Sequence, residues 1–268
     1  MGAEYNDLFE GEINYPDIDY QDRLNDLIGI DEHKSRVIKL LSLLINPIGI
    51  RNWAEKHYKK TPSIVNTTLK RPPLIVFEGD VGSGKTELAL TIGDAVARQE
   101  QINIILYPLS LSTRGEGRVG QMTKLISEAF EIVVNKAQKL KSSSGANQGG
   151  VILLIDEADS LAQSRESGQM HHEDRAGVNA LIRGIDRLGN GKLPGAVIMC
   201  TNRLNALDPA VKRRAADILT FGRPNEEQRK ALLKEPLSEL GLKEKEILQI
   251  VLATGNNGTN DYGFTFSD

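Results

Sequence analysis

The strongest constraint on the fold is a glycine-rich segment that lies between an apolar run and a helical pattern. It reads GDVGSGKT over residues 79–86 and fits the pattern G-x-x-x-x-G-K-[ST]. Leu74–Phe77 before it has the composition of a buried strand, and the apolar spacing of Thr86–Arg98 after it predicts a helix. Glycines let successive backbone N–H groups turn toward phosphate oxygens, and the helix adds its positive N-terminal end. The segment therefore predicts a phosphate-binding loop, or P-loop.

The expected ligands of this loop are ATP and Mg²⁺. In P-loops the lysine, here Lys85, bridges the β- and γ-phosphates, and the hydroxyl that follows, here Thr86, binds Mg²⁺. A GTPase is disfavoured because no Asn-Lys-x-Asp guanine-reading segment lies near the later expected strands. The nucleotide contacts expected from the loop come from Asp80, Val81, Gly82, Ser83, Gly84, Lys85 and Thr86.

Short apolar runs alternate with helical patterns along most of the chain. This alternation predicts an α/β fold of the P-loop NTPase type, with a parallel sheet between layers of helices. Pro47 predicts the end of a helix that begins near Asp31. The other expected strands are Ile102–Tyr107, Val151–Ile155, Ala196–Cys200 and Ile218–Phe221, and the other expected helices cover Met122–Val134 and Val178–Leu188.

Composition divides the chain into three parts. Residues 1–25 are acidic without a helical period, which indicates either a solvated tail or a segment that docks on a basic neighbour. Residues 26–222 carry the α/β pattern, with a polar loop expected at 59–73. Residues 223–268 become helical, with Asn225 as an N-cap and a second helix at Leu242–Leu252. We expect this last part to be a small helical lid domain.

Charge and cysteine content exclude several functional classes. A net charge of −3 argues against a dominant electrostatic grip on nucleic acid or on an anionic membrane. No apolar stretch approaches the roughly 20 residues of a membrane span, and the acidic start is unlike a signal peptide. Cys200 has no possible intrachain disulfide partner and is expected in the core. We expect a cytoplasmic protein without a membrane partner.

Two acidic residues end the strand expected at Val151–Ile155. Adjacent side chains of a pleated strand point to opposite sides, so Asp156 and Glu157 can perform different tasks. Asp156 is expected to hold Mg²⁺ through its water shell, and Glu157 to polarise the attacking water. The alternative is a strand that merely exits into solvent, which the upstream P-loop disfavours.

Further along the chain, polar residues follow the strand expected at Ala196–Cys200. Asn202 can orient water near the γ-phosphate, although an asparagine at a strand end is often a turn former. Arg213 and Arg214 either form a solvated basic face or include an arginine presented to a neighbour's γ-phosphate.

These motifs together resemble the AAA+ ATPases, in the family's order and spacing. Residues 28–31 (IGID) are similar to the family's opening motif, so the resemblance implies adenine contacts by Gly29 and Ile30. It also implies a large α/β domain, a helical lid and hexameric rings. Within the family, residues 174–186 and 207–225 resemble the pachytene-checkpoint ATPases (thyroid receptor-interacting protein thirteen), which remodel HORMA-domain proteins. That likeness places the arginine finger at Arg214, with Arg213 as its alternate.

The chain also departs from that pattern. The P-loop begins too early to leave room for a separate N-terminal adaptor domain, as in compact bacterial members that accompany HORMA proteins in anti-phage systems. In the family, an aromatic residue of the central pore loop grips the threaded protein chain. Residues 112–118, expected as this loop, carry no aromatic residue, so either the loop grips the threaded chain by charge and backbone or the pore loop lies elsewhere in the sequence. The family's second sensor arginine has no match before Asp268, so we expect an incomplete lid.

The resemblance implies a remodelling ATPase that unfolds or disassembles a protein partner, specifically a HORMA-domain protein. The alternatives are a nucleic-acid motor or clamp-loader-like ATPase, disfavoured by the charge, and a nucleotide-gated scaffold, disfavoured by the presence of both Asp156 and Glu157. His171 and His172 are adjacent, which makes a shared metal ion unfavourable, and we expect them on a second pore-facing loop at residues 160–175.

Overall fold

The computed structural model describes residues 8–111, 121–142, 147–161, 172–189, 193–256 and 263–268. Its centre is a six-stranded sheet with the order β1-β3-β4-β5-β2-β6. Five strands run parallel, and β1 pairs antiparallel with β3 at one edge. The strands are β1 (Ile13–Tyr15), β2 (Leu74–Gly79), β3 (Asn103–Ser110), β4 (Gly149–Asp156), β5 (Gly195–Thr201) and β6 (Ala215–Phe221). The predicted α/β sheet is confirmed, with one antiparallel edge strand added.

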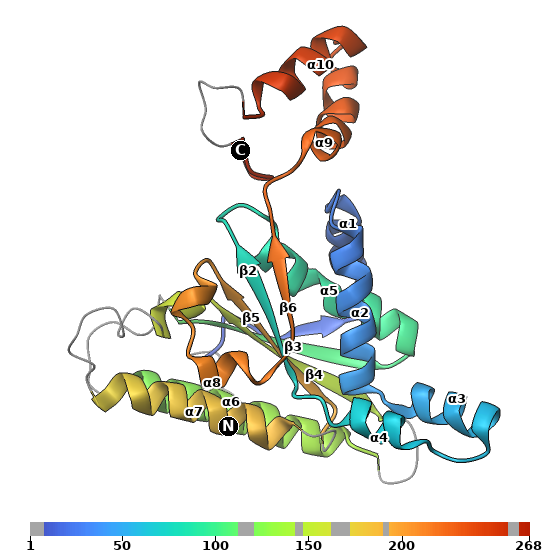
Figure 1. The fold of residues 1–268 in the computed structure, drawn as a ribbon, viewed down its shortest axis with the longest axis vertical. Helices are drawn as coiled ribbons and strands as arrows, with labels where there is room; N and C mark the ends of the chain where they lie inside the picture. The colour runs from blue at the N-terminus through green and yellow to red at the C-terminus, as the bar shows by residue number, and fades with distance from the viewer. Residues whose placement is uncertain (1–7, 112–120, 143–146, 162–171, 190–192, 257–262) are drawn as a thin grey trace.

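Helices cover both faces of this sheet (Figure 1). The central strands β4 and β5 are buried, apart from the partly exposed Asp156, and they place alternate residues in two apolar clusters, one on each face. One cluster packs against α1 (Ile18–Asp26), α2 (Asp31–Ile45) and α5 (Lys85–Glu100). The other packs against α6 (Gln121–Leu140) and α7 (His172–Leu188). Cys200 is buried, as expected.

The interpretation of residues 1–25 as a solvated tail is wrong for the part that the structure describes. Tyr15 of β1 is buried, and its hydroxyl donates to the carbonyl of Leu90 in α5. Asp17 caps α1, and its backbone N–H donates to the buried carboxylate of Asp94 at 2.8 Å. The segment adds a sheet edge and a helix to the large domain, because tertiary contacts compensate for its weak apolar pattern.

The loop expected at residues 59–73 is also partly wrong. After α3 (Ile48–Tyr58), this stretch contains α4 (Ser63–Leu69), which packs against α3. The second pore-facing loop is shorter than expected as well, because Ala158–Leu161 forms a short 3-10 helix, η1, and His172 begins α7. The expected pore loop at residues 112–118 and His171 lie outside the described residues.

The C-terminal part consists of α9 (Glu226–Glu239) and α10 (Glu244–Ala253), which pack against each other beyond the end of β6 (Figure 1). The side chain of Asn225 accepts the backbone N–H of Gln228, and the side chain of Gln228 accepts the backbone N–H of Asn225, which together form a capping box. The Gln228 side-chain amide also donates to the carbonyl of Gly29 at 2.6 Å. This helical unit therefore contacts the segment that precedes α2.

Candidate nucleotide-binding site

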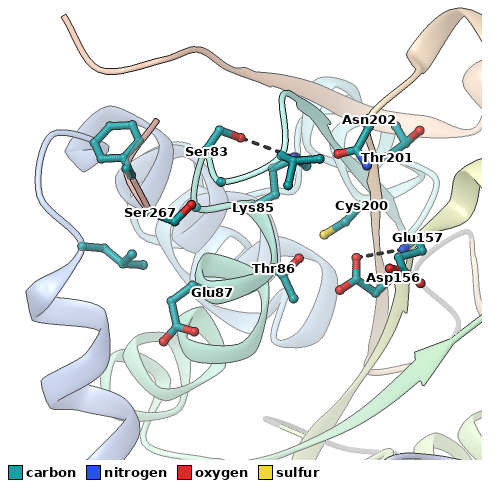
Figure 2. A pocket seen from close by; sticks show the side chains of 15 residues that line it. Ser83, Lys85, Thr86, Glu87, Asp156, Glu157, Cys200, Thr201, Asn202 and Ser267 are labelled. Carbon is teal, nitrogen blue, oxygen red and sulfur yellow. Dashed lines mark hydrogen bonds between the residues drawn. The ribbon is translucent and has the colours of Figure 1, made fainter. Parts of the chain in front are cut away.

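A cavity of about 510 Å³ lies at the carboxyl ends of the parallel strands. Ligands bind at this edge of open α/β sheets because the loops after the strands converge there. Figure 2 shows the P-loop side chains on one side of the cavity and the residues after β4 and β5 on the other. The predicted site residues that line it are Val81, Gly82, Ser83, Gly84, Lys85, Thr86, Asp156, Glu157 and Asn202. Leu27, Glu87, Cys200, Thr201, Phe266 and Ser267 complete the described lining.

The glycines of the loop meet two physical requirements. A Cβ at Gly79 would lie 2.1 Å from the carbonyl oxygen of Phe221, so only glycine lets β2 approach β6 this closely here. Gly84 has φ of 89° at the N-cap of α5 and supplies no side-chain cap. The first backbone N–H groups of α5 thus remain to be satisfied by water or a ligand, as in an anion site at a helix N-terminus.

Lys85 is buried, and its ammonium is held by the loop itself. It donates to the carbonyls of Gly79 at 2.8 Å and Asp80 at 2.6 Å, and to the Ser83 hydroxyl at 3.3 Å. Burial lowers the pKa of the Lys85 amine, while Cys200 and Asp156 oppose this shift. A phosphate group would offer this desolvated cation a full negative charge in place of neutral carbonyls.

The backbone of Glu157 differs from the extended strand conformation that was expected for it. Strand β4 ends at Asp156, and Glu157 has φ of 51°, in the left-handed region. Such a conformation costs a non-glycine residue about 1–3 kcal/mol and is concentrated at functional sites. The Asp156 carboxylate accepts the Glu157 N–H at 2.8 Å, which stabilises this turn. Glu157 therefore leaves the strand in a turn, and both carboxylates line the cavity.

The described residues suit Mg²⁺ better than a metal held by protein alone. The Thr86 hydroxyl and the Asp156 carboxylate both line the cavity, and Mg²⁺ prefers oxygen ligands supplied by one or two side chains, water and phosphates. Within the described ranges, no group of three or more His, Cys, Asp or Glu side chains is placed to hold a metal ion.

Asn202 lies directly after β5 and lines the cavity with Thr201. Its backbone N–H donates to the carboxylate of Asp159 in η1 at 3.0 Å. The Thr201 hydroxyl donates to the same carboxylate. Sequence reasoning missed Asp159, although a third carboxylate two residues after Glu157 was a usable signal.

The structure brings neither Arg213 nor Arg214 to the cavity of its own chain. Arg213 is exposed at the C-terminal end of the short helix α8 (Pro209–Lys212). Arg214 donates to both carboxylate oxygens of Asp186 in α7, at 2.7 and 2.9 Å, and to the carbonyl of Ala210. The hydrogen bond to Asp186 raises the pKa of the Arg214 guanidinium.

Three other predicted contacts do not line the described cavity. Ile30 is buried as the N-cap of α2, the carbonyl of Gly29 accepts from Gln228 of α9, and Asp80 pairs with Arg223 at 2.8 Å. Leu27, just before the IGID segment, lines the cavity instead.

Phe266 lines the cavity as well, and its N–H donates to the carbonyl of Gly82 at 3.0 Å. Leu27 and Phe266 add apolar side chains to the cavity, and a single sequence gave no signal for either.

Comparison with known proteins agrees with this geometry. A family model described as the ATPase family associated with various cellular activities (AAA) matches residues 75–223. CD-NTase-associated protein 6 of Escherichia coli strain MS 115-1 is 63% identical over 262 residues, which are 98% of this chain and 84% of that protein.

Two solved structures are also similar. A chain in the E. coli MS115-1 HORMA:CdnC:Trip13 complex matches with a TM-score of 0.87 at 62% identity, covering 97% of this chain and 85% of that one. Rhizobiales Trip13 matches with a TM-score of 0.72 at 52% identity, covering 97% of this chain and 86% of that one.

Proposed function

The chain belongs to the ATPase family associated with various cellular activities (AAA), and on this premise we propose that it uses ATP hydrolysis to remodel a HORMA-domain protein. The observation that carries the proposal is the convergence of Lys85, Asp156 and Glu157 on one cavity in a chain 62% identical to one solved in a complex that contains a HORMA protein. Nucleotide binding and ATP hydrolysis follow from the family.

Within this cavity we assign each residue one task. Lys85 leaves the loop carbonyls and binds the β- and γ-phosphates. Thr86 and Asp156 would hold Mg²⁺, which neutralises phosphate charge when it is bound. Glu157 polarises the attacking water, and Asn202 holds that water through its side-chain amide. Backbone groups of the P-loop cradle the phosphates, and Leu27 and Phe266 contact the base.

A neighbouring copy completes the site in this proposal. Arg214 lies outside its own cavity, but it carries a permanent charge on a half-buried side chain next to α7. An arginine that reaches a neighbour's γ-phosphate stabilises the charge of the transition state and is worth roughly 10³–10⁵ in rate. We therefore propose a homo-oligomeric ring, a hexamer by analogy with the family, with residues 26–222 as the large domain and 223–268 as the lid. The described part of residues 1–25, β1 and α1, packs on the large domain.

The described helices give no support for a membrane partner, since none of them combines the length and apolarity of a membrane span. The charge of −3 likewise gives no support for direct nucleic-acid binding.

The test of the client is a trapping experiment with the Glu157→Gln protein. With ATP, this variant should hold a purified HORMA protein through size-exclusion chromatography, because the nucleotide-bound state cannot turn over. The matched control is Glu131→Gln, the same change at an exposed position of α6. The HORMA assignment is wrong if the Glu157→Gln protein binds ATP but retains no more HORMA protein than the Glu131→Gln control.

A further inference from the structure

The direct pairing between β4 and β5 stops short of the proposed catalytic groups. The β4–β5 ladder ends at the pair Ile155 and Met199. Glu157 follows the end of one strand and Asn202 follows the end of the other, so both lie beyond the last paired residues. A direct link between the two ends beyond this ladder therefore has to come from side chains.

The carboxylate of Asp159 spans this gap with three hydrogen bonds. Its Oδ2 accepts the backbone N–H of Asn202 at 3.0 Å. Its Oδ1 accepts the backbone N–H of Arg203 at 3.1 Å and the hydroxyl of Thr201. The Thr201 hydroxyl in turn accepts the Arg203 N–H at 3.1 Å. One side chain from the turn after β4 therefore binds three consecutive residues at the end of β5.

We propose that Asp159 is a positioning residue for ATP hydrolysis, which fixes Asn202 relative to Glu157. The inference rests on the proposed roles of those two residues. Hydrogen bonds to a charged carboxylate are about twice as strong as neutral ones, and the Thr201 hydroxyl that donates to this carboxylate belongs to a buried residue. Asp159 itself does not line the cavity, and it acts through the residues that it holds.

This arrangement separates binding from chemistry. The P-loop that binds the phosphates lies between β2 and α5, whereas the hydrogen bonds that Asp159 accepts come from Thr201, Asn202 and Arg203. Asp159 acts on the P-loop only through its charge, which opposes the lowering of the Lys85 pKa by burial. Loosening Asp159 should displace the water-binding groups and leave the phosphate cradle in place. A misplacement of about 1 Å in a catalytic group can cost about 10²-fold in rate. A role in folding alone would lower stability without this selective effect on turnover.

The test compares Asp159→Asn with Asp94→Asn. Asp94 is a suitable control because it is a buried carboxylate away from the cavity and accepts hydrogen bonds from Asp17 and Arg98. ATP affinity, kcat and the melting temperature are measured for each protein, with kcat taken well below the melting transition. Asp159→Asn should lower kcat about 10–100-fold and change ATP affinity less than threefold. Asp94→Asn should lower the melting temperature and leave kcat within twofold. Wild-type kcat in Asp159→Asn, or an equal loss of ATP affinity, overturns the proposal.

Thr201→Val keeps the size of the side chain and the charge of Asp159 but removes one of the three bonds. If Asp159→Asn does not fold, the Thr201→Val protein tests the proposal instead. Its kcat should fall several-fold while its ATP affinity is retained, and an unchanged kcat contradicts the positioning role. Wild type and Glu157→Gln are run in the same assay. If Glu157→Gln still turns over ATP, the proposed function fails by itself, whatever Asp159 does.

Discussion

The ion pair between Arg214 and Asp186 allows a quantitative test of the proposed ring. Both side chains are partly exposed, by 32% and 52%. Pairs of this kind contribute roughly 0.2–1 kcal/mol, which corresponds to at most about a fivefold effect on an equilibrium. An arginine finger that is worth 10³-fold in rate contributes about 4 kcal/mol to the transition state. The transition-state term is several times larger, so Asp186 cannot keep Arg214 from a neighbour's phosphate.

Two substitutions should therefore behave very differently. Arg214→Ala should bind ATP normally and hydrolyse it roughly 10³-fold more slowly. Asp186→Asn releases the guanidinium without removing it, so its kcat should stay within about fivefold of wild type. Arg98→Ala is the control, because Arg98 is also ion-paired, with Asp94, but is remote from the cavity. The assay is steady-state phosphate release with ATP affinity measured in parallel.

Mixing two inactive proteins separates action on a neighbour from action within one chain. Lys85→Ala chains keep their finger, and Arg214→Ala chains keep their P-loop, so a mixed interface holds one complete site. Activity should rise above that of either protein alone once fluorescence transfer between labelled chains shows exchange. If exchange occurs and activity stays at background, Arg214 does not act on a neighbour. The same pair of experiments with Arg213→Ala then decides whether any finger is present in this segment.

Two further outcomes follow from the site and its surroundings. Lys85→Ala should abolish ATP binding in a calorimetric titration, because the loop would lose the cation that we assign to the β- and γ-phosphates; near-normal affinity would show that this lysine has been misassigned. Tyr15→Ala should cost about 3–5 kcal/mol of folding free energy, by analogy with other buried aromatic residues, because Tyr15 is buried and packs over Gly93. At about 2–4 °C per kcal/mol, its melting temperature should fall by roughly 6–20 °C, and an unchanged value would mean that the N-terminal segment is not part of the folded domain.

The sequence predicted the parts of the fold whose pattern is strong and local. The apolar runs placed all five parallel strands with ends that differ from the structure by at most three residues, as for Ile218–Phe221 against Ala215–Phe221. The glycine-rich loop and the acidic pair lie on one cavity, because carboxyl ends of parallel strands meet at one edge of the sheet. These elements carry their signals within a few residues each.

The parts that were missed depend on contacts between distant residues. Strand β1 has three residues, and α1 is mostly polar, so their stability comes from contacts with distant parts of the chain, which bury Tyr15 and Leu24 and bond Asp17 to Asp94 of α5. Leu27 and Phe266 come together across more than two hundred residues to line the cavity. A hydrophobic periodicity in a single sequence reveals neither the fold of β1 and α1 nor the pairing of Leu27 with Phe266 in the cavity.

The central claim is that this cavity hydrolyses ATP through Glu157, and one paired measurement tests it most directly. Glu157→Gln replaces the carboxylate by an amide of the same shape, which binds Mg²⁺-ATP normally but cannot polarise water in the same way. ATP affinity and the rate of phosphate release are measured on the same preparation of wild type and variant. We predict affinity within threefold of wild type and turnover reduced to background. Wild-type turnover in the Glu157→Gln protein would contradict the account.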